Sequence, residues 1–412
     1  QSGRREGKLV LAMVGLPARG KTFIARKLHR HLTWMGYNVH MCNVGNFRRK
    51  LLGPSQRHDF FNPDNEEGQK MRRKMAETAL AEMLDALCEG ADIGIYDATN
   101  TTKARRDWLA KSLRSAGSER GINLRLVYIE SICTDERVIR SNVRETKLKS
   151  PDYKDLDETA AVADFLKRIA HYVSVYQPVD DDEGCYIKLI DVGRKLIAHR
   201  INGFLNSRIL FFLQNLHITP HPIWITRHGE SEYNTQGRIG GDPGLSPRGH
   251  AYAQRLAVFI KSHYPPGTEL TVWTSCLRRT QITAGYMGRE MVHWRALNEI
   301  DAGVCDGMTY EAIAATMPDE YAARAADKYH YRYPRGESYQ DIVHRLEPVL
   351  IELMRMRNPV LIVSHQATLR VLYAYLTDRP PSTCPELLMP LHTCVQLTLK
   401  AYKTEEVRHE LM

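Results

Sequence analysis

The chain has 412 residues and a formal net charge of +9, with 43% hydrophobic and 25% charged residues, a balance typical of globular proteins. Because one hydrophobic core rarely serves so long a chain, this length predicts two domains of about 200 residues each. No apolar run approaches the ~18 residues that a membrane span requires. The polar, basic start at residues 1–8 has no apolar signal core behind it. We therefore expect a cytoplasmic protein with no membrane partner.

The positive charge is compatible with nucleic acid, an anionic membrane or small anionic substrates. The sequence contains no long Lys/Arg block and no recognisable nucleic-acid motif, and several arginines lie within candidate active-site motifs. We therefore expect phosphorylated substrates and no nucleic-acid partner, with the remaining charge on a solvated surface.

The eight cysteines are scattered and form no C-x-x-C pair. This spacing argues against a zinc site or a disulfide framework and suits a reducing cytosol. They are Cys42, Cys88, Cys133, Cys185, Cys276, Cys305, Cys384 and Cys394.

Short apolar segments alternate with helical patterns along the chain. The first series predicts strands at residues 8–14, 92–96, 124–129 and 186–190, and helices at about 21–35, 66–88, 157–176 and 195–216. Prolines 220 and 222 mark a boundary. The second series predicts strands at 222–226, 270–274 and 359–363, and helices at 247–263 and 338–357. This alternation predicts two α/β domains with mostly parallel sheets, at residues 1–217 and 218–412.

A phosphate-binding motif follows the first predicted strand. The string GLPARGKT matches G-x-x-x-x-G-K-[ST] and opens a predicted helix, which is the context that a P-loop requires. Its backbone amides and the helix N-terminus favour a polyphosphate. Lys21 would reach the outer phosphates of ATP, and the Thr22 hydroxyl would ligate Mg²⁺. The loop residues are Gly15, Leu16, Pro17, Ala18, Arg19, Gly20, Lys21 and Thr22.

An acid and three arginine doublets complete the candidate kinase site. Asp97 stands at the carboxyl end of a predicted strand, where it could hold the Mg²⁺ shell, accept a proton from an attacking hydroxyl, or only cap a helix. Each doublet taken alone is more often a solvated face, but together they offer bidentate donors for a phosphate on the acceptor. The doublets begin at Arg48, Arg72 and Arg105.

Two histidines follow predicted strands in the second half of the chain. His228 lies in the string RHGE, and His365 follows another strand far downstream. One imidazole could attack phosphorus while the other and Arg227 neutralise the phosphate oxygens. Arg279 follows a third strand, and Glu299 offers a carboxyl that could protonate the leaving oxygen, although an exposed loop acid remains the alternative.

The order of these motifs resembles the 6-phosphofructo-2-kinase/fructose-2,6-bisphosphatase family over nearly the whole chain. The matching strings are GLPARGKT (15–22), FNPDNEE (61–67), DATNTT (97–102), SPDYKD (150–155), RHGES (227–231), GRIGGDPGLSPRG (237–249), NEIDAGVCDGMTY (298–310), KYHYRYPRGESYQD (328–341) and SHQATLR (364–370). The resemblance implies a homodimer that makes fructose 2,6-bisphosphate from fructose 6-phosphate and ATP and hydrolyses it through a phosphohistidine, so controlling glycolysis and gluconeogenesis. It also implies a nucleoside-monophosphate-kinase-type P-loop fold and a phosphoglycerate mutase-like fold.

The resemblance also implies roles for individual residues. Asp97 and Cys133 would belong to the kinase centre together with Lys21. Asn142, Glu145 and Lys147 match the ATP-side segment. The fructose 6-phosphate site would comprise Arg48, Arg72, Thr99, Arg105, Lys147, Arg168 and Tyr172.

In the second half, His228 would be phosphorylated, Glu299 would donate the proton, and His365 would stabilise the transferring group. Some family members carry a non-basic residue at the position of Arg279 and are biased towards the kinase, so an arginine there implies a competent phosphatase. The bisphosphate site would comprise Arg227, Asn234, Gly240, Arg279, Tyr310, Arg324, Lys328, Tyr339, Gln366 and Arg370.

Three alternative functions remain at this stage. A phosphoglycerate mutase or acid phosphatase could be fused to an unrelated kinase, although the segments at 240–242 and 331–334 favour the bisphosphatase. A nucleic-acid end-processing enzyme would explain the positive charge and predicts steeply salt-dependent binding to oligonucleotides. A catalytically dead descendant is the third, against which the retained Lys21, Asp97, His228, Glu299 and His365 argue.

Overall fold

A six-stranded sheet forms the centre of each half of the chain in this computed structural model, which describes residues 7–54, 56–144, 151–153, 157–191, 193–216, 221–400 and 404–412. The chain divides into two units, Gln1–Leu216 and His217–Met412. Each unit has its own hydrophobic core and is described separately below. In the described residues, no helix is both long and apolar enough to cross a membrane.

The sheet of the first unit has the strand order β2-β3-β1-β4-β5-β6. All neighbouring strands are parallel except β5 and β6. The strands are β1 (Lys8–Val14), β2 (Val39–Asn43), β3 (Ile93–Asp97), β4 (Leu124–Ile132), β5 (Cys185–Ile190) and β6 (Lys195–His199). The strand order reverses between β1 and β4, and such a switch point at the carboxyl ends of the strands is where α/β sheets bind ligands.

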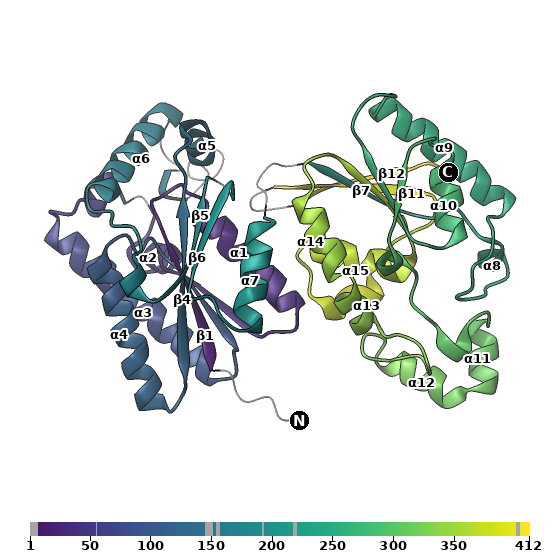
Figure 1. The fold of residues 1–412 in the computed structure, drawn as a ribbon, viewed down its shortest axis with the longest axis horizontal. Helices are drawn as coiled ribbons and strands as arrows, with labels where there is room; N and C mark the ends of the chain where they lie inside the picture. Colours follow the sequence, from purple (N-terminus) through teal and green to yellow (C-terminus); the bar gives the residue numbers. More distant parts are fainter. Residues whose placement is uncertain are drawn as a thin grey trace. The chain divides into compact units, whose positions relative to one another are not determined.

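Helices cover both faces of this sheet (Figure 1). α3 (Glu66–Cys88) and α4 (Lys103–Arg120) share one hydrophobic cluster with Val10, Ala12 and Val14 of β1. On the other face lie α1 (Lys21–Trp34) and α7 (Phe204–Gln214), which meet where the His31 ring stacks on Phe212 at 4.2 Å between centroids. The remaining helices are α2 (Val44–Leu52), η1 (His58–Phe61), α5 (Glu136–Asn142), η3 (Pro151–Tyr153), α6 (Glu158–Val173) and η4 (Asp181–Glu183).

The predicted helix at 195–216 is wrong over its first part. Residues 195–199 form β6, an edge strand antiparallel to β5, and the helix begins only at Phe204. Two positive backbone angles separate these elements, φ +51° at Arg200 and φ +90° at Gly203. A helix cannot continue through this left-handed backbone.

The sheet of the second unit has the order β12-β11-β7-β10-β8-β9. The inner strands are parallel, whereas β11 pairs antiparallel with both β7 and β12. The strands are β7 (Pro222–Arg227), β8 (Thr271–Thr274), β9 (Met291–His293), β10 (Val360–Ser364), β11 (Thr393–Leu399) and β12 (Thr404–Glu410). Both units are therefore α/β with mostly parallel sheets, as predicted.

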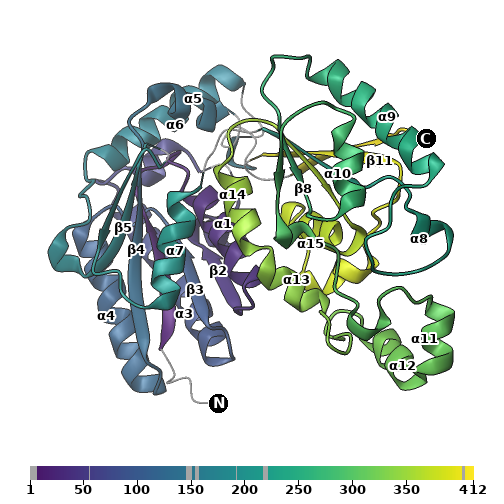
Figure 2. The same cartoon turned by 45° about the vertical axis from the view of Figure 1, so that its right-hand side comes forward.

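Helices again lie on both faces of the sheet (Figures 1 and 2). α9 (Pro247–His263) and α10 (Arg278–Gly285) pack on one face around Trp224 and Val272. On the other face lie α13 (Tyr339–Arg345), α14 (Glu347–Arg355) and α15 (Gln366–Leu376). The other helices are α8 (Glu232–Thr235), η5 (Arg295–Leu297), η6 (Gly303–Cys305), α11 (Tyr310–Thr316), α12 (Pro318–Ala326) and η7 (Pro381–Glu386).

The helix predicted at 338–357 is two helices in the structure. α13 ends at Arg345 and α14 begins at Glu347, with Pro348 in its first turn. Proline has no backbone N–H to donate back along a helix, so the pattern breaks there although its apolar periodicity continues.

Candidate active sites

The P-loop at residues 15–20 connects β1 to α1 in the first unit. Gly15 has φ +133°, and a Cβ there would lie 2.5 Å from the carbonyl oxygen of Ser131, so only glycine fits. Gly20 caps α1 with φ +79° and provides no side-chain hydrogen bond, and the space beside it is open. The first amides of α1 therefore have no side-chain cap at this position, and a phosphate can accept hydrogen bonds from them.

Two of the predicted ATP-side residues, Lys21 and Asn142, contact this loop. Lys21 is buried, and its Nζ donates to the carbonyl oxygen of Leu16 at 2.6 Å. Asn142, at the end of α5, donates from Nδ2 to the carbonyl oxygen of Ala18 at 3.1 Å. Arg19 donates to the carbonyl oxygen of Pro17 at 3.1 Å, and burial lowers the pKa of its guanidinium. Thr22 is half-buried in the first turn of α1, whereas the predicted Glu145 and Lys147 lie outside the described residues.

Asp97 ends β3 and is 3% exposed. Its Oδ2 accepts a hydrogen bond from Nδ2 of Asn43, while Oδ1 of Asn43 accepts from the backbone N–H of Asn46 and so caps α2. The loop after β3 is tied to the P-loop, because the backbone N–H of Gly15 donates to the carbonyl oxygen of Thr99 at 2.9 Å. Asn43 was not predicted; its only sequence signal is a polar residue at a strand end.

Cys133 follows β4 and packs in a cluster with Ala18 of the P-loop. Burial raises the pKa of its thiol, while a backbone hydrogen bond with Asp135 and the charge of Arg19 act in the opposite sense. A thiol with a raised pKa is a weak nucleophile. The structure therefore supports a packing role beside the loop over covalent chemistry.

Four predicted sugar-phosphate residues gather around Phe61, at the end of η1. The guanidinium of Arg168 lies over its ring at 3.6 Å from the centroid, and that of Arg48 at 5.5 Å. Arg72 donates from Nη1 to the carbonyl oxygen of Phe61 at 3.0 Å, and the ring of Tyr172 lies 6.0 Å away. Phe61 belongs to a quoted family string but was not predicted as a site residue.

Two of these arginines have unsatisfied buried donors among the described residues. Nη1 of Arg48 and Nε of Arg168 are buried and have no hydrogen-bond partner, although Arg48 is also paired with the buried carboxylate of Asp152. Leaving such donors unpaired is costly, and a phosphate oxygen would satisfy them. By contrast, Arg105 donates to the hydroxyl of Tyr96 at 3.3 Å and stacks on Trp108, away from this group of contacts.

The second member of each arginine doublet has a partner within the fold. Arg49 hydrogen-bonds Asn46, Arg73 pairs with Glu77 across one turn of α3, and the fully buried Arg106 pairs with Glu183 at 2.5 Å. These arginines are held within the fold. Of the first members of the doublets, Arg48 and Arg72 contact Phe61.

In the second unit, the register of β7 and β10 brings His228 and His365 together. Arg227 pairs with Ser364 across the two strands, so the next residue of each strand lies at the same edge of the sheet. The two imidazole rings are 5.1 Å apart between centroids, and both are buried. His365 also contacts the hydroxyl of Ser275, with 2.8 Å between Nε2 and Oγ.

Hydrogen bonds define the tautomer of His228. Its Nδ1 lies 2.6 Å from the carbonyl oxygen of Gly229, which can only accept, so Nδ1 carries the proton. Nε2 therefore presents a lone pair, which accepts from Nε of Arg279 at 3.2 Å. Burial, followed by the charges of Arg279 and Arg227, holds the pKa of His228 well below its usual range. The imidazole is neutral and nucleophilic at neutral pH.

Glu299 is oriented by two backbone amides. Its Oε1 accepts from the N–H groups of Ile300 at 3.0 Å and Ala367 at 3.1 Å. Arg227 lies in the same cavity; burial lowers the pKa of its guanidinium to about 10, against the opposing effect of the Glu299 carboxylate. Nε of Arg227 is buried with no hydrogen-bond partner among the described residues, as is Nδ1 of His365.

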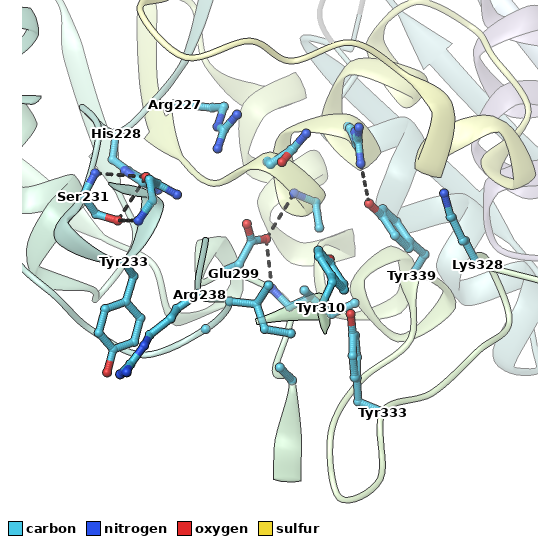
Figure 3. Close-up of a pocket in the computed structure, with 18 of the residues that line it drawn as sticks. Arg227, His228, Ser231, Tyr233, Arg238, Glu299, Tyr310, Lys328, Tyr333 and Tyr339 are labelled. Atoms are coloured by element: carbon cyan, nitrogen blue, oxygen red, sulfur yellow. Dashed lines mark hydrogen bonds between the residues drawn. The ribbon is translucent and has the colours of Figure 1, made fainter. Parts of the chain in front are cut away.

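These side chains surround a cavity of about 150 Å³ (Figure 3). The predicted residues that line it are Arg227, His228, Asn234, Gly240, Arg279, Glu299, Tyr310, Arg324, Lys328, Tyr339, Gln366 and Arg370. His365 is not among the lining residues, although its ring lies 5.1 Å from that of His228. The lining residues that were not predicted include Ser231, Tyr233, Arg238, Ile239, Ile300, Ala302, Tyr331, Tyr333 and Ala367. Several of these lie in the quoted family strings, which was the available signal.

Phenols position two further arginines of the cavity. Arg324 donates to the hydroxyl groups of Tyr333 at 2.8 Å and Tyr310 at 2.9 Å. Arg370 donates to the hydroxyl of Tyr339 at 3.0 Å. Together with Arg279 and Arg227, these arginines line the cavity with several guanidinium groups, which suits a substrate with two phosphates.

Each half of the chain matches a known protein family. Residues 2–220 match the family model of 6-phosphofructo-2-kinase, and residues 223–411 match that of the histidine phosphatase superfamily, branch 1. Curated relatives named 6-phosphofructo-2-kinase/fructose-2,6-bisphosphatase include one from Arabidopsis thaliana, 46% identical over 99% of this chain and 55% of the relative. Form 3 from Homo sapiens is 47% identical over 95% of this chain and 75% of the relative, and one from Gallus gallus is 46% identical over 96% and 83%. The chain belongs to the 6-phosphofructo-2-kinase/fructose-2,6-bisphosphatase family.

Proposed function

We propose that this chain is a bifunctional enzyme that makes fructose 2,6-bisphosphate from fructose 6-phosphate and ATP and hydrolyses it back to fructose 6-phosphate and phosphate. By setting the level of this bisphosphate it would control glycolysis and gluconeogenesis. We assign the kinase to residues 1–217 and the phosphatase to residues 218–412. The observation that carries the proposal is the cavity in which His228, Glu299 and several arginines meet, on a chain whose P-loop leads into a helix without a side-chain cap.

In the kinase, the chain's own residues bind and orient the substrates. The amides of the P-loop and Lys21 would hold the phosphates of ATP, and Thr22 would ligate Mg²⁺, which neutralises charge on the phosphates when bound. Asp97, held by Asn43, would accept the proton of the attacking sugar hydroxyl. Arg48, Arg72 and Arg168 would hold the 6-phosphate. Phosphoryl transfer depends mainly on such positioning and charge neutralisation.

The phosphatase reaction begins at His228. Its Nε2 lone pair attacks phosphorus, the bond from phosphorus to the sugar 2-oxygen breaks, and Arg279 moves its hydrogen bond from Nε2 to a phosphate oxygen. The short distance of 3.2 Å between Nε of Arg279 and Nε2 of His228 supports this exchange. Arg227 neutralises the remaining phosphoryl charge, and His365, whose Nδ1 has no hydrogen-bond partner among the described residues, would stabilise the transferring group.

Glu299 donates a proton in the first half-reaction and accepts one in the second. Because its Oε1 accepts two backbone amides, Oε2 is the oxygen that carries the proton to the leaving sugar oxygen. Glu299 is then a carboxylate, which takes a proton from the water that hydrolyses the phosphohistidine. Free phosphate leaves and His228 regains its lone pair.

Two assays test the proposal. Incubation with fructose 6-phosphate and ATP should yield an acid-labile sugar bisphosphate, and this activity should be lost in Lys21→Ala. Release of phosphate should occur from fructose 2,6-bisphosphate but not from 3-phosphoglycerate, and should be lost in His228→Ala. Turnover of 3-phosphoglycerate in place of the bisphosphate would instead favour a mutase-like enzyme, and either variant that kept full turnover would remove its site assignment.

Two further properties are proposed from family membership: assembly as a homodimer, and a cytoplasmic location. Sedimentation of the purified chain at several concentrations tests the first. A sedimentation coefficient that stays at the value of one chain throughout would contradict it. Fractionation of source cells tests the second.

A further inference from the structure

Three potential metal ligands meet on the first unit, outside the P-loop. Nδ1 of His58, in η1, lies 3.2 Å from Nε2 of His171, in the last turn of α6, and 3.1 Å from Oδ1 of Asp59. All three atoms lie within 4.8 Å of one another. The two histidines are partly buried and Asp59 is exposed, so the group is accessible to ions from solvent.

This arrangement is difficult to satisfy with protons alone. Nδ1 of His58 either shares its one proton between Oδ1 of Asp59 and Nε2 of His171, or accepts from His171 and turns a lone pair towards the carboxylate. Neither arrangement gives each contact a hydrogen bond of its own. A cation between the three atoms would interact with all of them at once. With bonds of 2.0–2.2 Å to nitrogen and oxygen, the edges of a tetrahedral zinc site are about 3.3 Å, close to the two distances observed.

We propose that His58, Asp59 and His171 form a binding site for Zn²⁺. Two imidazoles and one carboxylate favour Zn²⁺ over Mg²⁺ and Ca²⁺, because Mg²⁺ and Ca²⁺ prefer oxygen ligands. Three protein ligands leave the fourth position to water. No sequence pattern predicted this site, because its two histidines lie 113 residues apart in the chain.

A second cluster, His40, Cys42 and Glu82, serves as a comparison. Here Cys42 already donates to Oε1 of Glu82 at 3.7 Å, and Nε2 of His40 lies 3.4 Å from the same oxygen. Burial and the Glu82 carboxylate raise the pKa of the Cys42 thiol to about 12, which opposes the thiolate that a metal needs. The Cys42 thiol therefore keeps its proton and its hydrogen bond to Glu82, which disfavours a metal ion at this cluster.

The proposed zinc site and the candidate sugar-phosphate site share residues of η1 and α6. His58 and Phe61 are the two ends of η1, and His171 precedes Tyr172, whose ring lies 6.0 Å from that of Phe61. The backbone N–H of His58 also donates to Oδ1 of Asp164 on α6 at 3.2 Å. A metal bound here would fix η1 against α6 and thereby fix Phe61, on which Arg168 stacks. This consequence for the kinase rests on the proposed function.

Zn²⁺ titration of the whole, nucleotide-free chain by calorimetry tests the site, with excess Mg²⁺ present to fill oxygen sites. We expect one Zn²⁺ per chain, with an affinity that falls by more than about tenfold in His58→Gln and in His171→Gln because a ligand is lost. His40→Gln should bind as the parent does. Co²⁺ should give the visible bands of a tetrahedral ion in the parent and lose them in His171→Gln.

Unchanged affinity in both His58→Gln and His171→Gln, or loss of binding in His40→Gln, would overturn the site. Thermal unfolding without metal checks that the variants fold. The kinetic consequence is measured separately: Zn²⁺ should lower the KM for fructose 6-phosphate in the parent and not in His171→Gln. A tight site with no change in KM would overturn the coupling, whereas absence of any kinase activity would count against the proposed function and leave the binding result intact.

Discussion

Nε of Arg279 lies 3.2 Å from Nε2 of His228, and both side chains are buried. A guanidinium next to an imidazole lone pair excludes a proton from that nitrogen, because the protonated ring would place two positive charges side by side. Nη1 of Arg279 is fixed by the carbonyl oxygen of Gly241 at 2.8 Å. Arg279 therefore keeps Nε2 of His228 unprotonated, and its guanidinium is already positioned to bind the incoming phosphate.

Replacement of Arg279 by Gln should shift the pH profile of the phosphatase. The charge of Arg279 lowers the pKa of His228, so its loss raises that pKa, and the acid limb of kcat/KM should move to higher pH. At neutral pH we expect a loss of about 10²-fold, as for removal of a preorganised donor. Phosphate release measured from pH 5 to 9 gives both values. An acid limb that stayed in place would refute the electrostatic role.

Gly240→Ala should weaken the phosphatase through Arg279. Gly240 has φ +72°, and a Cβ there would lie 1.7 Å from Oδ1 of Asp306, which accepts the N–H of Gly241 at 2.8 Å. The loop must move, and Arg279 loses its anchor, so we expect kcat/KM to fall about 10- to 100-fold. Gly244→Ala is the control, because its Cβ would meet only Glu232, at 3.9 Å. Equal effects of the two changes would contradict this account.

Phe61→Leu should raise the KM for fructose 6-phosphate about tenfold, because Arg168 loses the ring on which it stacks at 3.6 Å. The KM for ATP should not change, since the P-loop contacts are separate. Phe60→Leu is the matched control and should not raise the KM for fructose 6-phosphate in this way. The ring of Phe60 meets that of Phe61 edge-on, with 5.1 Å between centroids. Initial rates against each substrate decide the matter, and a rise in the KM for ATP alone would be the contrary result.

His31 should make the stability of the first unit pH-dependent. Burial, followed by the charge of Arg208, lowers its pKa from 6.5 to about 4. The folded state thus binds fewer protons than the unfolded state, and stability present above pH 6.5 is lost as the pH falls to about 4. The loss amounts to about 3 kcal/mol of unfolding free energy. Urea unfolding at several pH values should show a smaller loss in His31→Leu; an identical pH dependence would exclude His31 as the cause.

Most of the fold follows from local sequence patterns. The helix predicted at 66–88 agrees with α3, and the strand at 8–14 agrees with β1. The errors occurred where backbone geometry overrode periodicity, at Arg200 and at Pro348. The edge strand β2 was missed because VHMCN is half polar and its outer side has no neighbouring strand, so no apolar run marks it.

The phosphatase cavity was more accessible to prediction than the kinase site. Its residues lie in contiguous strings that end strands, and β7 and β10 carry His228 and His365 to one edge of the sheet. Phe61 and Asn43 were missed because their contributions depend on partners distant in sequence, Arg168 and Asp97. The same reason hides the pairing of His58 with His171, which only the packing of η1 on α6 creates.

The most direct test of the central claim is rapid quenching of the protein with fructose 2,6-bisphosphate labelled at the 2-phosphate. The account predicts acid-labile, base-stable label on the protein, absent from His228→Ala, because Nε2 of His228 is the only attacking atom proposed. Label that persists in His228→Ala would contradict the account. Phosphate released at the parent rate by His228→Ala would contradict it equally, since hydrolysis would then proceed without the phosphohistidine.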